Sequence, residues 1–274
     1  MLRKAVSTVV PDSGKRAIDS VRARSFLRRV GPLNDEYVRR SGLEIRRGPF
    51  AGMRYLSGQE HVSGHLIAKL AGTYERQIYP WLAEWVAYQP ELVIDVGCAE
   101  GFYAVGLARA IPRVNVHAYD IDERARGYCA ELARINDVQD RVAIRGLCTP
   151  STLAEVSAVR VVLLSDCEGY EKTLLDPEIA PNLRDWSIVV ELHDNVDPAI
   201  STTIEARFGE THEIELVEYA HPERDGLPEL DWMSDKQAQL VLHERPLPMS
   251  WAFLRPRSTS ATRAKTAVPT RKND

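Results

Sequence analysis

The chain has 274 residues, of which 44% are hydrophobic and 27% are charged, and its formal net charge is −4. This composition is typical of a soluble globular protein, and the length allows one sizeable α/β domain with extensions. No apolar run is long enough to span a bilayer, which excludes integral membrane association from our expectations.

Positive charge is concentrated at the two ends of the chain. Lys and Arg outnumber Asp and Glu in residues 1–30 and in residues 255–274, so the body between them is strongly acidic. An acidic body does not attract a polyanion, and we therefore expect no nucleic-acid partner. Basic ends are usually solvated tails, although the N-terminal segment leaves peripheral membrane contact open.

The N-terminus lacks the apolar core of a secretory signal, because Val9 and Val10 are followed at once by Pro11. The cysteines fit no C-x-x-C metal pattern. We therefore expect reduced thiols in a cytoplasmic protein. The cysteines are Cys98, Cys129, Cys148 and Cys167.

The first part of the chain predicts an extension in front of the main domain. Residues 15–30 carry a loose apolar stripe and predict a basic amphipathic helix. The alternation over 43–56, broken by glycines, predicts a small hairpin. Residues 64–87 are typical of helix, in two pieces interrupted near Gly72 and Pro80.

The clearest pattern runs from residue 91 to 192, where buried-strand runs alternate with helical patterns. Such alternation, with almost continuously apolar strands, predicts a parallel sheet covered by helices on both faces. The expected strands are 92–97, 114–120, 141–147, 159–166 and 186–194, and the expected helices are 102–111, 123–136 and shorter ones from 151 and 170.

A helix at 198–207 and two further strands, 212–220 and 250–254, are expected after this pattern. No crossover helix of the usual kind joins the two strands, which indicates an antiparallel edge of the sheet.

The loop after the first predicted strand carries a D-x-G-x-x-x-G pattern that begins at Asp95. Gly97 allows a sharp turn and the close approach of a ligand, and Gly101 allows a tight start of the next helix. A nucleotide dehydrogenase would show G-x-G-x-x-G without acids in the loop. Carboxylates at Asp95 and Glu100 would repel a pyrophosphate and suit a positively charged ligand. The alternative is a strand–turn–helix in which the glycines serve geometry alone.

The second predicted strand ends at Asp120, about twenty residues after the glycine loop, where an acid can accept hydrogen bonds from both hydroxyls of a ribose. Ile121 would pack on the face of an adenine, with Leu147 at the end of the third strand on its other side. We interpret Asp122 as the N-cap of the following helix.

Residues 164–175 read LSDCEGYEKTLL, and residues 189–193 read VVELH. The first segment resembles the D-x-E-G-x-E-x-x-(V/L)-L signature of FkbM-type class I S-adenosylmethionine-dependent methyltransferases, and the second resembles the acid that follows on strand five of that family. The resemblance covers about residues 91–220, with the motifs in the right order. It implies a Rossmann-like seven-stranded sheet, mostly parallel with an antiparallel last strand.

The resemblance also implies S-adenosylmethionine as the cofactor and methyl transfer to a hydroxyl, commonly on a sugar, a glycan or a secondary metabolite. Asp166, Glu191 and His193 are the expected catalytic residues, with His193 as the preferred general base. The expected cofactor contacts are Asp95, Gly97, Cys98, Ala99, Glu100, Gly101, Phe102, Tyr103, Asp120, Ile121 and Leu147. For Glu168 and Glu171, the competing interpretation is favourable electrostatics at a helix N-terminus.

A metal ion is not expected as a fixed part of this site. Asp166, Asp194 and Asn195 nevertheless look superficially like the oxygen ligands of metal-dependent catechol-type methyltransferases, so Mg²⁺ stays open as an alternative.

Residues 221–249 are long for a connection between two strands. We expect them to cover the acceptor pocket, with Trp232 and Met233 as apolar lining and His221 or His243 as polar contacts. A helix packed on the edge of the sheet is the alternative.

Three parts are thus predicted: an N-terminal extension over residues 1–60, a methyltransferase domain over 61–256 and a disordered basic tail over 257–274. Two other functions stay open, a nicotinamide-dependent oxidoreductase and a non-catalytic module that binds a cofactor as a scaffold. The oligomeric state stays open as well.

Overall fold

The computed structural model describes residues 13–56, 65–244 and 249–257, and side chains from residue 26 onward. Its centre is a sheet in the order β3-β2-β1-β4-β5-β7-β6. The strands are β1 (Leu92–Val96), β2 (Asn115–Tyr119), β3 (Val142–Arg145), β4 (Val161–Ser165), β5 (Ser187–Leu192), β6 (His212–Glu218) and β7 (Ser250–Pro256).

The first five strands are parallel, whereas β7 is antiparallel to both β5 and β6. The expected seven-stranded, Rossmann-like α/β sheet with an antiparallel last strand is therefore confirmed. Strand order reverses between β1 and β4, and in open α/β sheets the carboxyl ends of the strands at such a point are where ligands bind.

Helices and 3₁₀ turns surround this sheet. They are α2 (Ser13–Ser41), α3 (Leu66–Ala71), η2 (Arg76–Ile78), α4 (Tyr79–Tyr88), α5 (Phe102–Ala110), α6 (Glu123–Ile135), η3 (Gln139–Arg141), α7 (Pro150–Ala154), α8 (Glu171–Leu174), η4 (Pro181–Asp185), α9 (Ile200–Phe208), η5 (Pro228–Leu230) and α10 (Asp235–Leu242).

Two apolar cores lie on the two faces of the sheet. Successive strand residues point to opposite faces, so Val93 joins one core and Ile94 the other. The first core is formed with α4, α5 and α6, and the second with α7, α8 and α9. Both faces of β1, β4 and β5 are therefore buried, which explains why these strands are continuous apolar runs, whereas the edge strand β3 buries only Val142.

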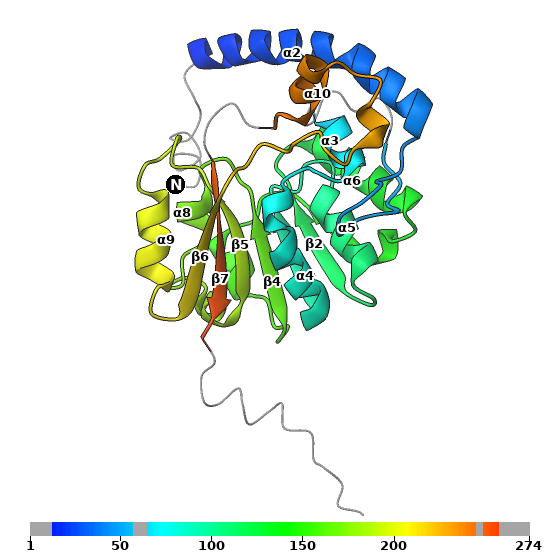
Figure 1. The fold of residues 1–274 in the computed structure, drawn as a ribbon. Helices are drawn as coiled ribbons and strands as arrows, with labels where there is room; N and C mark the ends of the chain where they lie inside the picture. Colours follow the sequence, from blue (N-terminus) through cyan, green and yellow to red (C-terminus); the bar gives the residue numbers. More distant parts are fainter. Residues whose placement is uncertain (1–12, 57–64, 245–248, 258–274) are drawn as a thin grey trace, which may run out of the picture.

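The N-terminal extension runs across the carboxyl ends of the parallel strands, with α10 and α3 beside it (Figure 1). The helix α2 continues eleven residues beyond the expected end at residue 30 and contains Pro32. The expected hairpin at 43–56 is reduced to one antiparallel bridge, between Glu44 and Arg54. Pro80 does not interrupt a helix, because it lies in the first turn of α4, where its missing N–H costs nothing.

The segment 221–249, as far as it is described, contains η5 and α10. The helix α10 packs on α2 and α3 rather than on the edge of the sheet. Met233 is buried, and Trp232 lies under the guanidinium of Arg40. His221 and His243 stack on each other, with ring centroids 4.6 Å apart.

Within the part of the chain that the structure describes, no helix combines the length and the apolar character that a bilayer crossing needs.

Candidate functional site

The glycine loop connects β1 to α5 and lies against the loop that follows β4. Gly97 has a φ of 85°, and a Cβ atom there would stand 1.7 Å from the carbonyl oxygen of Asp166. Gly101 has a φ of 91° and lies against the Sγ atom of Cys129. Both positions therefore need glycine, as expected, and the sharp turn brings the start of α5 to the carboxyl edge of the sheet.

Asp95 lies at the end of β1 and is fully buried. Burial, together with the nearby carboxylate of Asp166, raises the pKa of Asp95 to about 8. The backbone amide of Ala104 offsets only part of this effect. A positively charged ligand at this edge of the sheet would favour the ionised form of Asp95.

Glu100 points away from solvent into an ion pair with Lys69 of α3, and it also accepts a hydrogen bond from the hydroxyl of Tyr55. Burial alone would raise the pKa of Glu100, but Lys69 and Tyr55 hold it below its ordinary value. The expectation that this carboxylate complements a cationic ligand loses its basis, because Lys69 already balances its charge.

The side chains of Phe102 and Tyr103 also belong to the protein interior. Phe102 packs edge-on against Phe50, with ring centroids 5.2 Å apart, and Tyr103 donates a hydrogen bond to Glu75. Cys98 is buried beside them. At these positions the backbone N–H groups at the start of α5, rather than the side chains, are suited to contact a ligand.

The carboxylate of Asp120 follows β2 and faces the glycine loop. It accepts hydrogen bonds from the amides of Ala99, at 2.9 Å, and Asp122, at 2.8 Å. The side chains of Ile121 and Leu147 are 80% and 53% exposed, although both are large and apolar. Asp122 accepts from the amide of Arg124 and caps α6, as expected.

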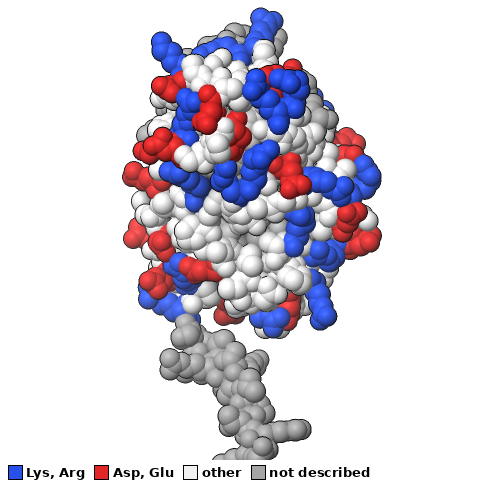
Figure 2. All heavy atoms as spheres, turned by 45° about the vertical axis from the view of Figure 1, so that its right-hand side comes forward, with Lys and Arg blue, Asp and Glu red and all other residues white. Residues whose placement is uncertain are grey.

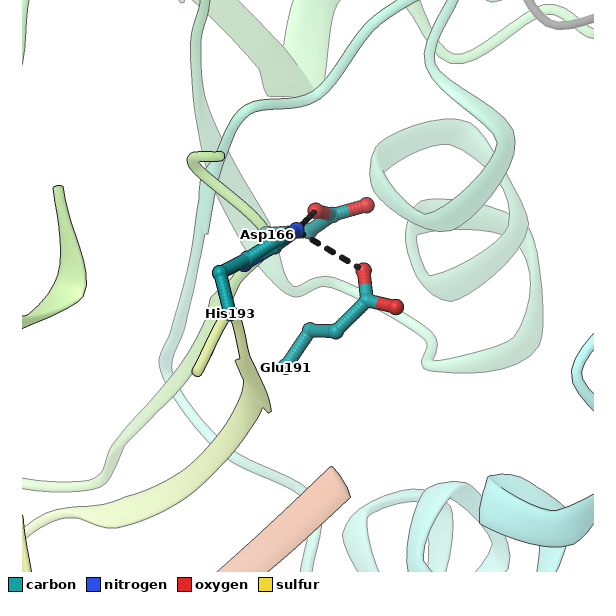
Figure 3. Close-up of side chains that lie close together, drawn as sticks. All are labelled: Asp166, Glu191 and His193. Atoms are coloured by element: carbon teal, nitrogen blue, oxygen red, sulfur yellow. Dashed lines mark ion pairs between the residues drawn. The ribbon is translucent and has the colours of Figure 1, made fainter. Parts of the chain in front are cut away.

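His193 is the centre of a second group of side chains, at the ends of β4 and β5 (Figure 3). The Nε2 atom of its buried imidazole lies 3.5 Å from Asp166, 3.5 Å from Glu168 and 3.7 Å from Glu191. All three expected catalytic residues are therefore adjacent, because neighbouring parallel strands bring their carboxyl ends to the same edge.

Glu171 completes this group on the other side of the ring. Its Oε1 atom lies 2.7 Å from Nδ1 of His193 and accepts hydrogen bonds from the amides of Cys167 and Gly169. Burial alone would lower the pKa of His193, but Glu171, with Asp166 and Glu168, raises it above its ordinary value. Glu171 belongs to the motif, with helix N-terminal electrostatics as its competing interpretation, but nothing in the sequence predicted this contact with His193.

The alternative oxygen set of Asp166, Asp194 and Asn195 is not assembled. The carboxylate of Asp194 accepts hydrogen bonds from the amide and the hydroxyl of Ser201 in α9, and Asn195 is exposed. The residues whose ligand atoms lie together, all within 4.8 Å of one another, are Asp166, Glu191 and His193.

The chain matches no protein-family model and no curated protein sequence. Among solved structures it is similar to cofactor-bound Rv0187 from MTB, at 18% identity over 65% of this chain and 79% of that chain, with a TM-score of 0.44. It is also similar to the O-methyltransferase TomG from Streptomyces achromogenes in complex with SAM, at 14% identity over 65% and 80% of the two chains, with a TM-score of 0.43. An rRNA methylase from Streptococcus thermophilus has 14% identity over 67% and 98%, with a TM-score of 0.43. At these identities and TM-scores, a functional assignment depends on the residues of this chain.

Proposed function

We propose that this protein is an S-adenosylmethionine-dependent methyltransferase of the FkbM type that methylates a hydroxyl of a small polar acceptor, such as a sugar, a glycan or a natural product. The observation that carries the proposal is the grouping at the ends of β1 and β2. There, a tight glycine loop at the switch point of the sheet is followed by the Asp120 carboxylate and the exposed side chain of Ile121 after β2, and the exposed side chain of Leu147 comes after the neighbouring strand β3.

Each part of this grouping fits one part of the cofactor. Each carboxylate oxygen of Asp120 has a further lone pair beyond its backbone hydrogen bond, so the two can accept from the two ribose hydroxyls. Ile121 and Leu147 would lose exposed apolar surface against the adenine ring, which is favourable by about 25 cal/mol per Å². The positive charge of the bound cofactor would favour the ionised form of Asp95, whose pKa is raised to about 8 by burial and by Asp166.

When bound, the cofactor supplies an electrophilic methyl group. The task left to the protein is to align the acceptor oxygen with that methyl group and to receive the hydroxyl proton. Asp166 lies beside the glycine loop and contacts His193, so the acceptor hydroxyl would bind between these groups and the cofactor site. Placement of the acceptor there would exclude water from the reacting oxygen.

Charge on one face of the protein agrees with a small acceptor. On the face shown in Figure 2, Lys and Arg are mixed with Asp and Glu around an uncharged area, in place of a continuous basic track. A nucleic acid requires such a track to neutralise its phosphates.

Titration calorimetry with S-adenosylmethionine and S-adenosylhomocysteine tests the proposal. We expect micromolar binding to the wild type and at least a tenfold loss in Asp120→Ala, which is about 1.4 kcal/mol. Asp122→Ala is the matched control, because it removes a carboxylate two residues away that caps α6; it should lower stability by about 1 kcal/mol and leave binding intact. A folded wild type that binds neither compound would refute the proposal.

A further inference from the structure

The Nε2 atom of His193 faces three carboxylates without forming a hydrogen bond to any of them. His193 is 1% exposed, and its Nε2 has no hydrogen-bond partner among the described residues. Its distances to Asp166, Glu168 and Glu191 are 3.5, 3.5 and 3.7 Å, longer than an N–H···O hydrogen bond of about 2.7 to 3.2 Å. A buried nitrogen thus lies near three carboxylates without a hydrogen bond to any of them.

These distances match the spacing of atoms that share one ion. Two ligand atoms, each about 2.1 Å from a metal ion, lie about 3.0 Å apart in an octahedral arrangement and about 3.4 Å apart in a tetrahedral one. The observed contacts are only slightly wider. A small cation between them would draw the ligands inward by a few tenths of an ångström.

Glu171 is placed to hold the imidazole in the form that a metal ion requires. Its Oε1 atom lies 2.7 Å from Nδ1 and is itself anchored by two backbone amides. A proton on Nδ1 that is donated to Glu171 leaves the lone pair of Nε2 directed at Asp166 and Glu191. Metal-binding histidines commonly have such a carboxylate on their second nitrogen.

The backbone conformation at Glu168 also supports the binding of an ion. Glu168 has a φ of 54°, in the left-handed region that a residue with a side chain rarely adopts. The strained turn directs the carboxylate of Glu168 back toward His193, although 78% of that side chain is exposed. An exposed carboxylate at this point can close on an ion or make way for an acceptor.

We propose that Asp166, Glu191 and His193 bind a divalent cation of the Mn²⁺ or Fe²⁺ class, with Glu168 as an outer carboxylate ligand. One imidazole together with carboxylates is a donor set that suits Mn²⁺ and Fe²⁺, which accept both nitrogen and oxygen ligands. The role of the ion in catalysis rests on the proposed function. The ion would bind the acceptor hydroxyl and lower the pKa of that hydroxyl. His193 would then be a ligand and not the general base that the sequence suggested, and the hydroxyl proton would pass to the exposed carboxylate of Glu168.

Metal binding can be measured without cofactor or acceptor. We expect one Mn²⁺ to bind per chain of metal-stripped wild type, by calorimetry and by loss of the free-ion signal in electron paramagnetic resonance. His193→Gln and Asp166→Asn should each weaken binding at least tenfold. Glu168→Gln, an exposed change that leaves the core intact, should also weaken it. His243→Gln is the matched control and should bind as the wild type does.

A positioning role for Glu171 predicts a distinct result. Glu171→Gln keeps the shape of the side chain but is a weaker acceptor for the Nδ1 proton, so it should weaken Mn²⁺ about tenfold and leave one ion per chain. Affinity for S-adenosylmethionine should stay within about twofold of wild type in Glu168→Gln, which separates this test from that of the cofactor site. The proposal would be overturned if the wild type showed no saturable Mn²⁺ binding. It would also be overturned if the His193→Gln and Glu168→Gln variants bound Mn²⁺ as tightly as the wild type does.

Discussion

The Cα atom of Gly97 lies so close to the loop after β4 that only a hydrogen atom fits between it and the Asp166 carbonyl. Gly97→Ala should therefore cost about 3 kcal/mol of unfolding free energy, since it combines a positive φ with a clash against backbone. Urea denaturation measures the change. Gly146→Ala is the control, because nothing lies within 4 Å of the added Cβ, and its effect should stay within about 0.5 kcal/mol. Equal effects of the two variants would contradict this account.

The roles of single residues could be predicted where the residues lie at the ends of adjacent strands. They could not be predicted where they depend on contacts with distant segments of the chain. Asp166, Glu191 and His193 could be placed together because β4 and β5 are adjacent and end at one edge. The partner of Glu100 could not be predicted, since Lys69 lies in another helix and no local pattern links the two. The same limit hid the contact between Glu171 and His193.

Between elements, the pair of Lys69 and Glu100 joins α3 to the glycine loop, and both side chains are almost fully buried, at 3% and 2% exposure. Lys69→Met should cost about 3 to 5 kcal/mol, because it leaves a buried carboxylate without its cation. Combining Lys69→Met with Glu100→Gln should restore much of this loss, as the charge is then removed from both sides. A double variant as unstable as Lys69→Met alone, by chemical denaturation, would show that the charge is not the cause.

The start of β6 carries His212, which is fully buried in a neutral form: its Nε2 lies 2.9 Å from the carbonyl of Trp186 and its Nδ1 lies 2.8 Å from the hydroxyl of Thr211. Burial lowers its pKa below the ordinary value of 6.5, although the Trp186 carbonyl acts in the opposite direction. Above pH 6.5, His212 is neutral in both the folded and the unfolded chain, so its titration does not lower the free energy of unfolding. As the pH falls below about 6.5, the unfolded chain binds a proton that the folded chain resists, so stability falls.

This sign predicts a difference between wild type and His212→Asn. Between pH 7.5 and 5.5 the urea midpoint of the wild type should fall more steeply than that of His212→Asn, by an amount that corresponds to about 1.4 kcal/mol per unit of pKa shift. Parallel pH profiles of the two proteins would show that His212 titrates freely in the fold.

The positions of helices and strands could be predicted where packing on the sheet alone determines their apolar pattern. The five parallel strands were expected within a few residues, and β1, β4 and β5 were clearest because both of their faces are buried. The length of α2 was not, because its continuation through Pro32 is stabilised by packing of Val30, Leu33 and Tyr37 on the rest of the protein. The position of α10 on α2 and α3 likewise depends on contacts between distant parts of the chain.

In the whole molecule, the N-terminal extension shares a core with the sheet. Val30, Tyr37 and Ile45 belong to the same apolar cluster as Val93 and Phe102. A chain that lacks residues 1–56 should therefore lose its cooperative unfolding transition, and with it the cofactor site, because this cluster and the hydroxyl of Tyr55 on Glu100 are lost together. Circular dichroism on heating measures this. An unchanged midpoint would mean that residues 1–56 form a separate unit.

The backbone contact between Gly97 and Asp166, reinforced by the hydrogen bond from the Asp166 amide to the carbonyl of Val96, joins the two loops directly. The binding of ligands at the two loops would thus be coupled. A ligand that displaces Asp166 would also displace the turn at Gly97. Thermodynamic reciprocity then requires each occupant to change the affinity of the other by the same factor. If both proposed ligands bind, they should enter and leave as linked partners, and departure of the spent cofactor would loosen the hold on the methylated product.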